Sequence, residues 1–268
     1  MIQHIYKHDS SDYGLLYAWF PAMHTRVDVV LYSTLPESAL LSTVRDIQQL
    51  VAALEAMGNC YDEGSELAGV NRMAAHQPVT LSDELYALLC RCVEYNKATL
   101  GLFDVTVHSI GYNAHTMSAV ILDSLRQTVS YARTGIRICL SAILKGYALD
   151  KLRTLLLTRG IRDALISMGN SSVLGLGNHP HGIGWKLSDE VILSNQCYTV
   201  SGNDAPDRRH ILSPTTGTLI EGKRQVGIVT HEGTLGEVLS TALFAASEEQ
   251  RALLIEQFRS KLLYVSCS

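Results

Sequence analysis

The sequence has no glycine-rich phosphate loop, since neither GxGxxG nor GxxxxGK[ST] occurs among its 20 glycines. Doubly wound dinucleotide-binding folds and P-loop NTPases depend on such loops, whose backbone N–H groups hold the phosphates. The GxSxG turn that presents a nucleophilic serine is also absent. These three classes of enzyme therefore have no support in the sequence.

Cysteine is present without a metal-binding or redox spacing. The six cysteines form no CxxC pair, and no histidine follows them at zinc-finger spacing. Cys90 and Cys92 fall on one expected helix, where residues two apart point in different directions. Reduced and mostly buried thiols are expected, and a cysteine-based structural metal site is not: Cys60, Cys90, Cys92, Cys139, Cys197 and Cys267.

Charge and hydropathy exclude two classes of partner. Lys and Arg total 22 against 26 Asp and Glu, a net charge of -4 with no basic stripe for a nucleic-acid backbone. No apolar run approaches the ~20 residues of a membrane span. The N-terminal stretch MIQHIYKHDSSDYGLL has no cationic segment followed by an apolar one, so a cytoplasmic location is expected.

The remaining pattern predicts an α+β fold. With 268 residues and 47% hydrophobic content, the chain is long enough to bury a large core. Period-two segments predict strands and period-3.6 segments predict helices. Strands or extended segments are expected at 26–32, 102–107, 136–140, 164–169, 173–177, 185–187, 196–200, 225–230 and 261–266, and helices at 37–57, 81–99, 142–159, 236–246 and 248–258.

Two sites in this pattern point to phosphate. Lys145 and Gly146 fall where a strand meets a helix, and a helix N-terminus attracts anions. A lysine lying along the surface is the alternative. His210 follows two arginines and precedes a turn containing Pro214 and Gly217, which suits a rigid phosphate-binding loop. An exposed basic loop is the alternative there.

A metal site is suggested by Glu237 and Thr241, which lie four residues apart and so share one face of the expected helix. Mg²⁺ takes few protein ligands and completes its shell with phosphate oxygens and water. The alternative is a surface glutamate and a threonine bonded to the preceding turn. Asp104 and Thr106 form a second carboxylate–hydroxyl pair, on one face of the segment 102–107.

The order of these blocks carries more information than any one of them. In sequence they are Ala22-Met-His-Thr25, Ser65-Glu-Leu-Ala-Gly-Val-Asn71, Gly101-Leu-Phe-Asp-Val-Thr-Val107, Lys145-Gly-Tyr-Ala-Leu-Asp150, Ser201-Gly202, the loop from His210 to Gly217, and the segment from Glu237 to Thr241. Over most of its length the chain thereby resembles the FAD:protein FMN transferases, the ApbE family.

The resemblance implies one domain over 1–268 with a T-fold-like architecture: two interwoven lobes, mixed or antiparallel sheets and a nucleotide cleft between the lobes. It implies FAD as substrate, Mg²⁺ on the diphosphate, and transfer of FMN to a Thr or Ser hydroxyl of an acceptor flavoprotein. Lys145 and His210 would act on the phosphates, and Glu237, Thr241 and a backbone carbonyl at Ser141 would hold the metal. The nucleotide would contact Met23, Asp104, Thr106, Lys145, Gly146, Ser201 and His210.

The chain also departs from the family pattern. Cys139-Leu-Ser-Ala-Ile-Leu-Lys-Gly146 replaces Asp-Leu-Gly-Gly-Ile-Ala-Lys-Gly, so Cβ atoms are expected to restrict the backbone at Ser141 and Ala142. His24 stands where the family has glycine, and Glu237 where it has the shorter aspartate. Two alternatives to transfer therefore stay open: a non-catalytic relative that binds a flavin or another nucleotide, and hydrolysis of FAD to FMN and AMP.

Overall fold

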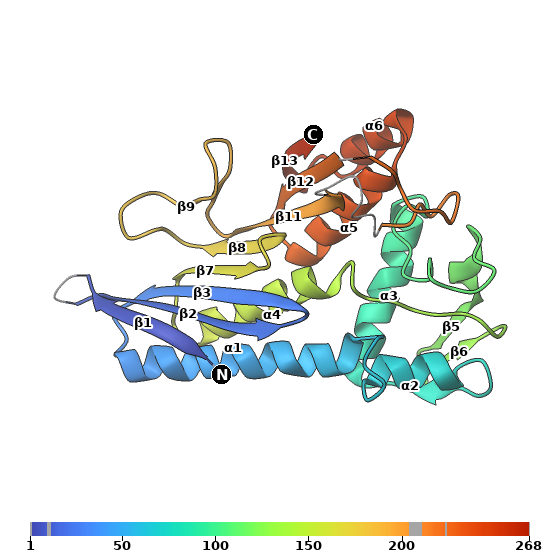
Figure 1. Cartoon of the computed structure of the whole chain (residues 1–268), viewed down its shortest axis with the longest axis horizontal. Helices are drawn as coiled ribbons and strands as arrows, with labels where there is room; N and C mark the ends of the chain where they lie inside the picture. Colours follow the sequence, from blue (N-terminus) through green and yellow to red (C-terminus); the bar gives the residue numbers. More distant parts are fainter. Residues whose placement is uncertain (1, 10–11, 204–210, 223, 268) are drawn as a thin grey trace.

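The computed structural model describes residues 2–9, 12–203, 211–222 and 224–267. Its main feature is an antiparallel eight-stranded sheet in the order β1-β2-β3-β7-β8-β11-β12-β13 (Figure 1). The strands are β1 (Gln3–His8), β2 (Gly14–Ala22), β3 (Thr25–Ser33), β7 (Asp163–Met168), β8 (Ser172–Leu176), β11 (Gln196–Asn203), β12 (Arg224–Thr230) and β13 (Leu262–Cys267).

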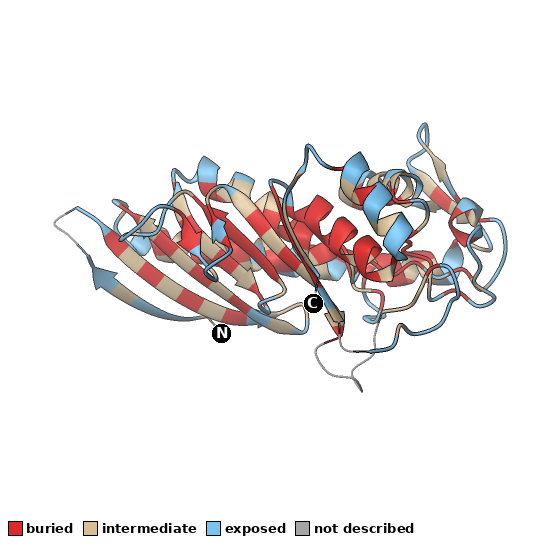
Figure 2. Ribbon diagram, turned by 90° about the horizontal axis from the view of Figure 1, so that it is seen from above, coloured by how far each residue is buried: buried red, intermediate tan, exposed pale blue. Residues whose placement is uncertain are grey.

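Helices cover one face of this sheet. Long helix α1 (Glu37–Gly58) packs on β2, α4 (Leu144–Thr158) on β8, and α5 (Gly233–Ala245) on β11 and β12. Figure 2 shows the resulting alternation of buried and less buried residues along the strands. In β2, Leu16, Ala18 and Phe20 are buried toward the helices, while Tyr17 and Trp19 stack on the other face. The fold is α+β with antiparallel sheets, as the sequence predicted.

A smaller layer lies beyond one end of the large sheet (Figure 1). It contains α2 (Glu66–Met73), α3 (Asp83–Ala98) and a three-stranded sheet in the order β4-β6-β5. The remaining elements are β4 (Val79–Thr80), the 3₁₀ turn η1 (Thr116–Ala119), β5 (Val120–Asp123), β6 (Thr128–Tyr131), the β9–β10 hairpin (Trp185–Lys186, Ile192–Leu193) and α6 (Glu248–Gln257). No helix in the described part of the chain is long and apolar enough to cross a membrane.

Most predicted elements are confirmed with small shifts at their ends. Ser82 caps α3 as expected, its hydroxyl accepting a hydrogen bond from the Leu85 N–H at 3.3 Å. The hairpin at 164–177 forms as β7 and β8, and α4 begins two residues later than predicted. The sequence analysis missed β1 and β2, because Leu15, Tyr17 and Trp19 make the outer face of β2 apolar and remove the polar alternation that marks a strand.

Two predicted extended segments are not strands. The chain turns at 102–107 because the Asp104 carboxylate accepts hydrogen bonds from both the N–H and the hydroxyl of Thr106, an Asx-type turn. Residues 136–140 join no sheet, because the side-chain amide of Asn71 pairs with Ile138 in place of a neighbouring strand. Asn71 donates to the Ile138 carbonyl and accepts from its N–H, both at 2.9 Å.

The α4–α5 contact positions the two helices that carry the predicted phosphate and metal residues. Asp150 on α4 accepts hydrogen bonds from the backbone N–H groups of Gly233 (2.7 Å) and Thr234 (2.9 Å), the first turn of α5. Gly146 packs against the same turn, where an added Cβ would lie 2.2 Å from the Gly233 carbonyl oxygen. Asp150 thus fixes the first turn of α5 against α4.

Replacing Asp150 with alanine should therefore destabilise the protein. Two N–H groups would lose a charged acceptor at a helix N-terminus, a loss of about 1–2 kcal/mol in the free energy of unfolding. Urea unfolding followed by circular dichroism measures it. Asp189→Ala is the matched control, because that carboxylate is 95% exposed and pairs only with Lys186 among the described residues. Equal stability of the two variants would contradict the capping role.

Candidate functional site

A cleft of about 990 Å³ brings together residues from the large sheet, α4, α5 and the loop 102–108. Of the residues predicted from the sequence, it is lined by Met23, Asp104, Ser141, Lys145, Ser201, Glu237 and Thr241. Thr106 and Gly146 are buried behind its wall. His210 lies outside the described residues. Seven residues far apart in the sequence thus share one cavity.

Lys145 lies in the first turn of α4 and extends into the cleft. Its ammonium group donates a hydrogen bond to the Ser171 hydroxyl, which belongs to the turn between β7 and β8. That turn has positive φ at Gly169 (65°) and Asn170 (61°), and it packs against Thr25. A cation held by one neutral hydroxyl keeps donors for an anionic ligand.

Glu237 is a buried carboxylate, only 4% exposed, on α5. The Ser172 hydroxyl and the Gly146 backbone N–H donate hydrogen bonds to it. Burial raises the pKa of Glu237, although the nearby Lys145 charge and these hydrogen bonds act in the opposite direction. The alternative interpretation as a surface glutamate is wrong.

Thr241 follows Glu237 by one helical turn and meets β11. Its hydroxyl lies 3.1 Å from that of Ser201, which in turn lies 2.8 Å from the hydroxyl of Ser240. A threonine bonded only to its preceding turn was the alternative, whereas the contact observed is across to the sheet. Glu237, Thr241 and Ser201 therefore present one carboxylate and two hydroxyls to the same cleft.

Asp104 lies on the opposite wall of the cleft. Burial raises the pKa of its carboxyl group, and hydrogen bonds from Thr106 and Tyr112 oppose that rise. The Tyr112 hydroxyl lies 3.1 Å from both Asp104 Oδ2 and the Pro214 carbonyl oxygen. Asp104 is thereby connected to the loop that follows His210, although the sequence did not single out Tyr112.

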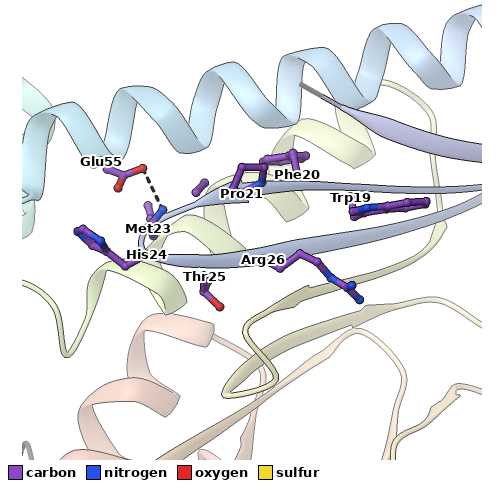
Figure 3. Close-up of a pocket in the computed structure, with 9 residues that line it drawn as sticks. Trp19, Phe20, Pro21, Met23, His24, Thr25, Arg26 and Glu55 are labelled. Carbon is purple, nitrogen blue, oxygen red and sulfur yellow. Dashed lines mark hydrogen bonds between the residues drawn. The ribbon is translucent and has the colours of Figure 1, made fainter.

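The hairpin turn Met23-His24 reaches the cleft from β2 and β3. Both residues have positive φ, 49° and 57°, as a two-residue type I′ turn requires and as glycine or asparagine adopts most easily. Figure 3 shows Glu55 of α1 beside this turn, where its carboxylate accepts a hydrogen bond from the Met23 N–H at 2.9 Å. The glycine that the family pattern has in place of His24 would relieve this strain.

Two serines and a histidine were missed as site residues. The turn Asn170-Ser-Ser172 was not counted among the site residues, yet Ser171 hydrogen-bonds Lys145 and Ser172 hydrogen-bonds Glu237. The available signal was the position of this turn at the end of a hairpin whose next strand, β8, is buried throughout. His108, which also lines the cleft, follows Val107 with no pattern of its own.

The cysteines are unpaired in the described residues, and four of the six are buried. Cys139 lies beside the cleft, with its sulfur 3.2 Å from the Ser141 hydroxyl. A hydrogen bond from Cys60 lowers the pKa of Cys139 to about 5, while the same contact and burial raise the pKa of Cys60. Cys139 occupies the position where the family pattern has aspartate.

Comparison with known proteins gives consistent matches over most of the chain. A protein named FAD:protein FMN transferase from Chlamydia muridarum is 24% identical over 265 residues, covering 84% of this chain and 82% of that protein. Another of that name, from Treponema pallidum, is 25% identical, with 86% and 78% covered.

Solved structures show the same fold. The apo flavinyl transferase ApbE of Pseudomonas stutzeri superposes with a TM-score of 0.80 at 17% identity, covering 97% of this chain and 92% of that one. An ApbE protein of Thermotoga maritima gives a TM-score of 0.77 at 21% identity, with 94% and 93% covered. The model of the ApbE family itself matches residues 23–265. The chain therefore belongs to the ApbE family.

Proposed function

We propose that this protein transfers the FMN part of FAD to a threonine or serine hydroxyl of an acceptor protein. The observation that carries the proposal is the shared cleft, in which Lys145 on α4 and Glu237 and Thr241 on α5 face one volume of about 990 Å³. Membership of the ApbE family and relatives named FAD:protein FMN transferase support it. The extent of the domain, 1–268, and a cytoplasmic location stay predictions.

The reaction is a substitution at phosphorus. The acceptor hydroxyl oxygen forms a bond to the phosphorus on the FMN side of the diphosphate, and the bond from that phosphorus to the bridging oxygen breaks. AMP leaves with the bridging oxygen and its electron pair, and the hydroxyl proton passes to water. Positioning and charge neutralisation supply most of the catalysis in such transfers. We expect the Lys145 ammonium to neutralise phosphate oxygens, and its hydrogen bond to the Ser171 hydroxyl supports this role by holding it in the cleft.

The residues present fit a Mg²⁺ ion bound together with a diphosphate. Glu237, Thr241 and Ser141 line the same cleft and supply a carboxylate, a hydroxyl and a backbone carbonyl. The described residues contain no cluster of three or more His, Cys, Asp and Glu side chains that could hold a metal alone. Mg²⁺ usually binds to only a few protein ligands and completes its coordination shell with phosphate oxygens and water. When bound, the ion would neutralise charge on the diphosphate.

Lys145→Met should abolish transfer. Loss of a charge aimed at the reacting phosphate lowers the rate by about a hundredfold or more. The protein is incubated with FAD, MgCl₂ and an extract from cells lacking this enzyme, and covalent flavin is read as fluorescent bands on a denaturing gel. Lys151→Met is the matched control, because Lys151 lies on the same helix but pairs with Glu84, outside the cleft.

The same assay separates the alternatives. AMP release from FAD without any acceptor would favour hydrolysis to FMN and AMP. Tight FAD binding by calorimetry with neither bands nor AMP would favour a non-catalytic nucleotide-binding protein. Bands of equal intensity from Lys145→Met and wild type would contradict the role given to Lys145.

Removal of divalent cations should stop the transfer. With EDTA in excess we expect no fluorescent band, and MgCl₂ should restore it, because the negative charge on the diphosphate would otherwise stay uncompensated. Glu237→Ala should weaken the binding of Mg²⁺, so that half-maximal transfer requires about tenfold more MgCl₂. Transfer that is unchanged in EDTA would contradict the metal site.

Glu237 should also make the metal-free protein less stable as pH rises. The unfolded side chain ionises near its ordinary pKa of 4.5, whereas burial raises the pKa in the folded protein. Stability from the protonated form is therefore complete below that ordinary value and is lost as pH rises through the raised pKa. Glu237→Gln is neutral throughout, so in EDTA its free energy of unfolding should match that of wild type near pH 4 and exceed it near pH 7.

Urea unfolding at both pH values tests this prediction. The control is Glu249→Gln, since Glu249 is exposed on α6 and its replacement should change the pH profile little. A Glu237→Gln variant that is less stable than wild type near pH 7 would contradict the prediction that the ionised Glu237 carboxylate destabilises the metal-free protein.

A further inference from the structure

A second cavity of about 600 Å³ lies next to the cleft, and two arginines, Arg72 and Arg137, line it. It is formed by the segment 60–63, α2, the segment 108–110 and the segment 135–137, and we call it the arginine groove. The residues used here to define it are Arg72, Arg137, His108, Asn71, Ile110 and Glu63. Arg133 lies beside it, with its guanidinium donating to the Ile110 carbonyl at 2.9 Å.

The three guanidiniums have no carboxylate partner among the described residues. Arg72 donates to the Glu63 backbone carbonyl at 3.0 Å, and Arg137 donates to the Cys60 carbonyl at 3.5 Å. The Arg137 guanidinium also lies 5.3 Å from the centre of the Tyr61 ring. A guanidinium has five N–H donors, so most of those of Arg72 and Arg137 stay available to a ligand. Arg133 keeps fewer, because it donates to the carbonyls of Ile110, Thr134 and Gly111. Arginines held in place by carbonyl and ring contacts suit planar recognition of carboxylates.

The local charge contrasts with that of the whole chain. Glu63 is the acidic side chain lining the groove, against Arg72, Arg137 and the neighbouring Arg133, whereas the chain as a whole carries a net charge of -4. Ile110 is 80% exposed beside these arginines. A long nucleic-acid backbone would meet repulsion outside so small a basic region. A short acidic segment with an apolar residue is complementary to it.

The groove and the cleft are neighbours, because His108 lines both. A polypeptide lying in the groove would thus be directed toward Lys145 and Glu237, where the flavin diphosphate is proposed to bind.

We propose that the arginine groove binds an acidic segment of the acceptor protein, next to the hydroxyl that receives FMN. This inference rests on the proposed function, because it assigns the acceptor a binding surface beside the same cleft. Arg72 and Arg137 contact carboxylates of the acceptor, Ile110 contacts an apolar side chain, and His108 marks the passage into the cleft.

The test uses two fluorescein-labelled peptides of about 15 residues, the length that a groove beside one cleft can hold. Each has one central threonine and one leucine, flanked by aspartates in the first peptide and by asparagines in the second. Fluorescence anisotropy with the FAD- and Mg²⁺-loaded protein measures binding. We expect the aspartate peptide to bind about tenfold more tightly, and less so at high salt, because exposed ion pairs are individually weak and screened.

Charge variants separate binding in the groove from binding elsewhere. Arg72→Ala combined with Arg137→Ala should remove the preference for aspartate, whereas Arg72→Lys with Arg137→Lys should keep most of it. Arg45→Ala is the matched control, since Arg45 is an exposed arginine of α1 outside the groove. Thermal unfolding of each variant verifies that it is folded.

Equal binding of both peptides by wild type would overturn the proposal, as would a preference that survives in the double alanine variant. Flavin transfer is measured separately with the cell extract. Failure of the proposed function would appear as no fluorescent band with wild type, whereas failure of the groove alone would leave those bands intact in the double alanine variant.

Discussion

The packing of α4 on α5 is the constraint on which the rest of the site depends. Asp150 reaches from α4 to the first turn of α5, and Gly146 lets the two backbones approach too closely for any side chain. This contact places Lys145 at the start of one helix near Glu237 on the other. A cation and a buried carboxylate so arranged can contact one ligand without any movement of α4 or α5.

In this arrangement the ionised form of Glu237 is disfavoured in the folded protein. Burial raises the pKa of Glu237, and hydrogen bonds from Ser172 and Gly146 offset only part of the effect. A bound cation would supply the rest of the compensation. The buried Glu237 carboxylate would therefore destabilise the cation-free protein more than the cation-bound one. Local destabilisation of this kind is common at functional sites.

Most of the fold could be predicted from the sequence because helical and strand periodicity survive in α1, α3, β3 and the β7–β8 hairpin. The failures occur where side chains replace backbone pairing. Asn71 forms the hydrogen bonds to Ile138 that a neighbouring strand would otherwise form. Asp104 accepts a hydrogen bond from the Thr106 N–H and so makes its own segment a turn. No local pattern reports such contacts, since Asn71 and Ile138 are 67 residues apart.

Site residues divide in the same way. Lys145 and Glu237 could be found from the spacing of charged residues at expected helices, because each lies on one element. The roles of Ser171, Ser172 and Tyr112 depend on which elements meet in space, so the sequence could at most mark the turn that carries the two serines and not the contacts that they make. The arginine groove likewise draws its residues from four separate segments, and no single one of them marks a binding site.

The departures from the family pattern have unequal physical consequences. Backbone restriction was expected at Ser141 and Ala142, yet neither residue has the positive φ that would require glycine, so their Cβ atoms add bulk at the cleft wall without backbone strain. At His24 the opposite holds, since its φ of 57° does favour glycine. His24 nevertheless occupies this position, and its imidazole lines the cleft where the hairpin turn borders it. The substitutions in this chain therefore change what faces the ligand more than how the backbone surrounds it.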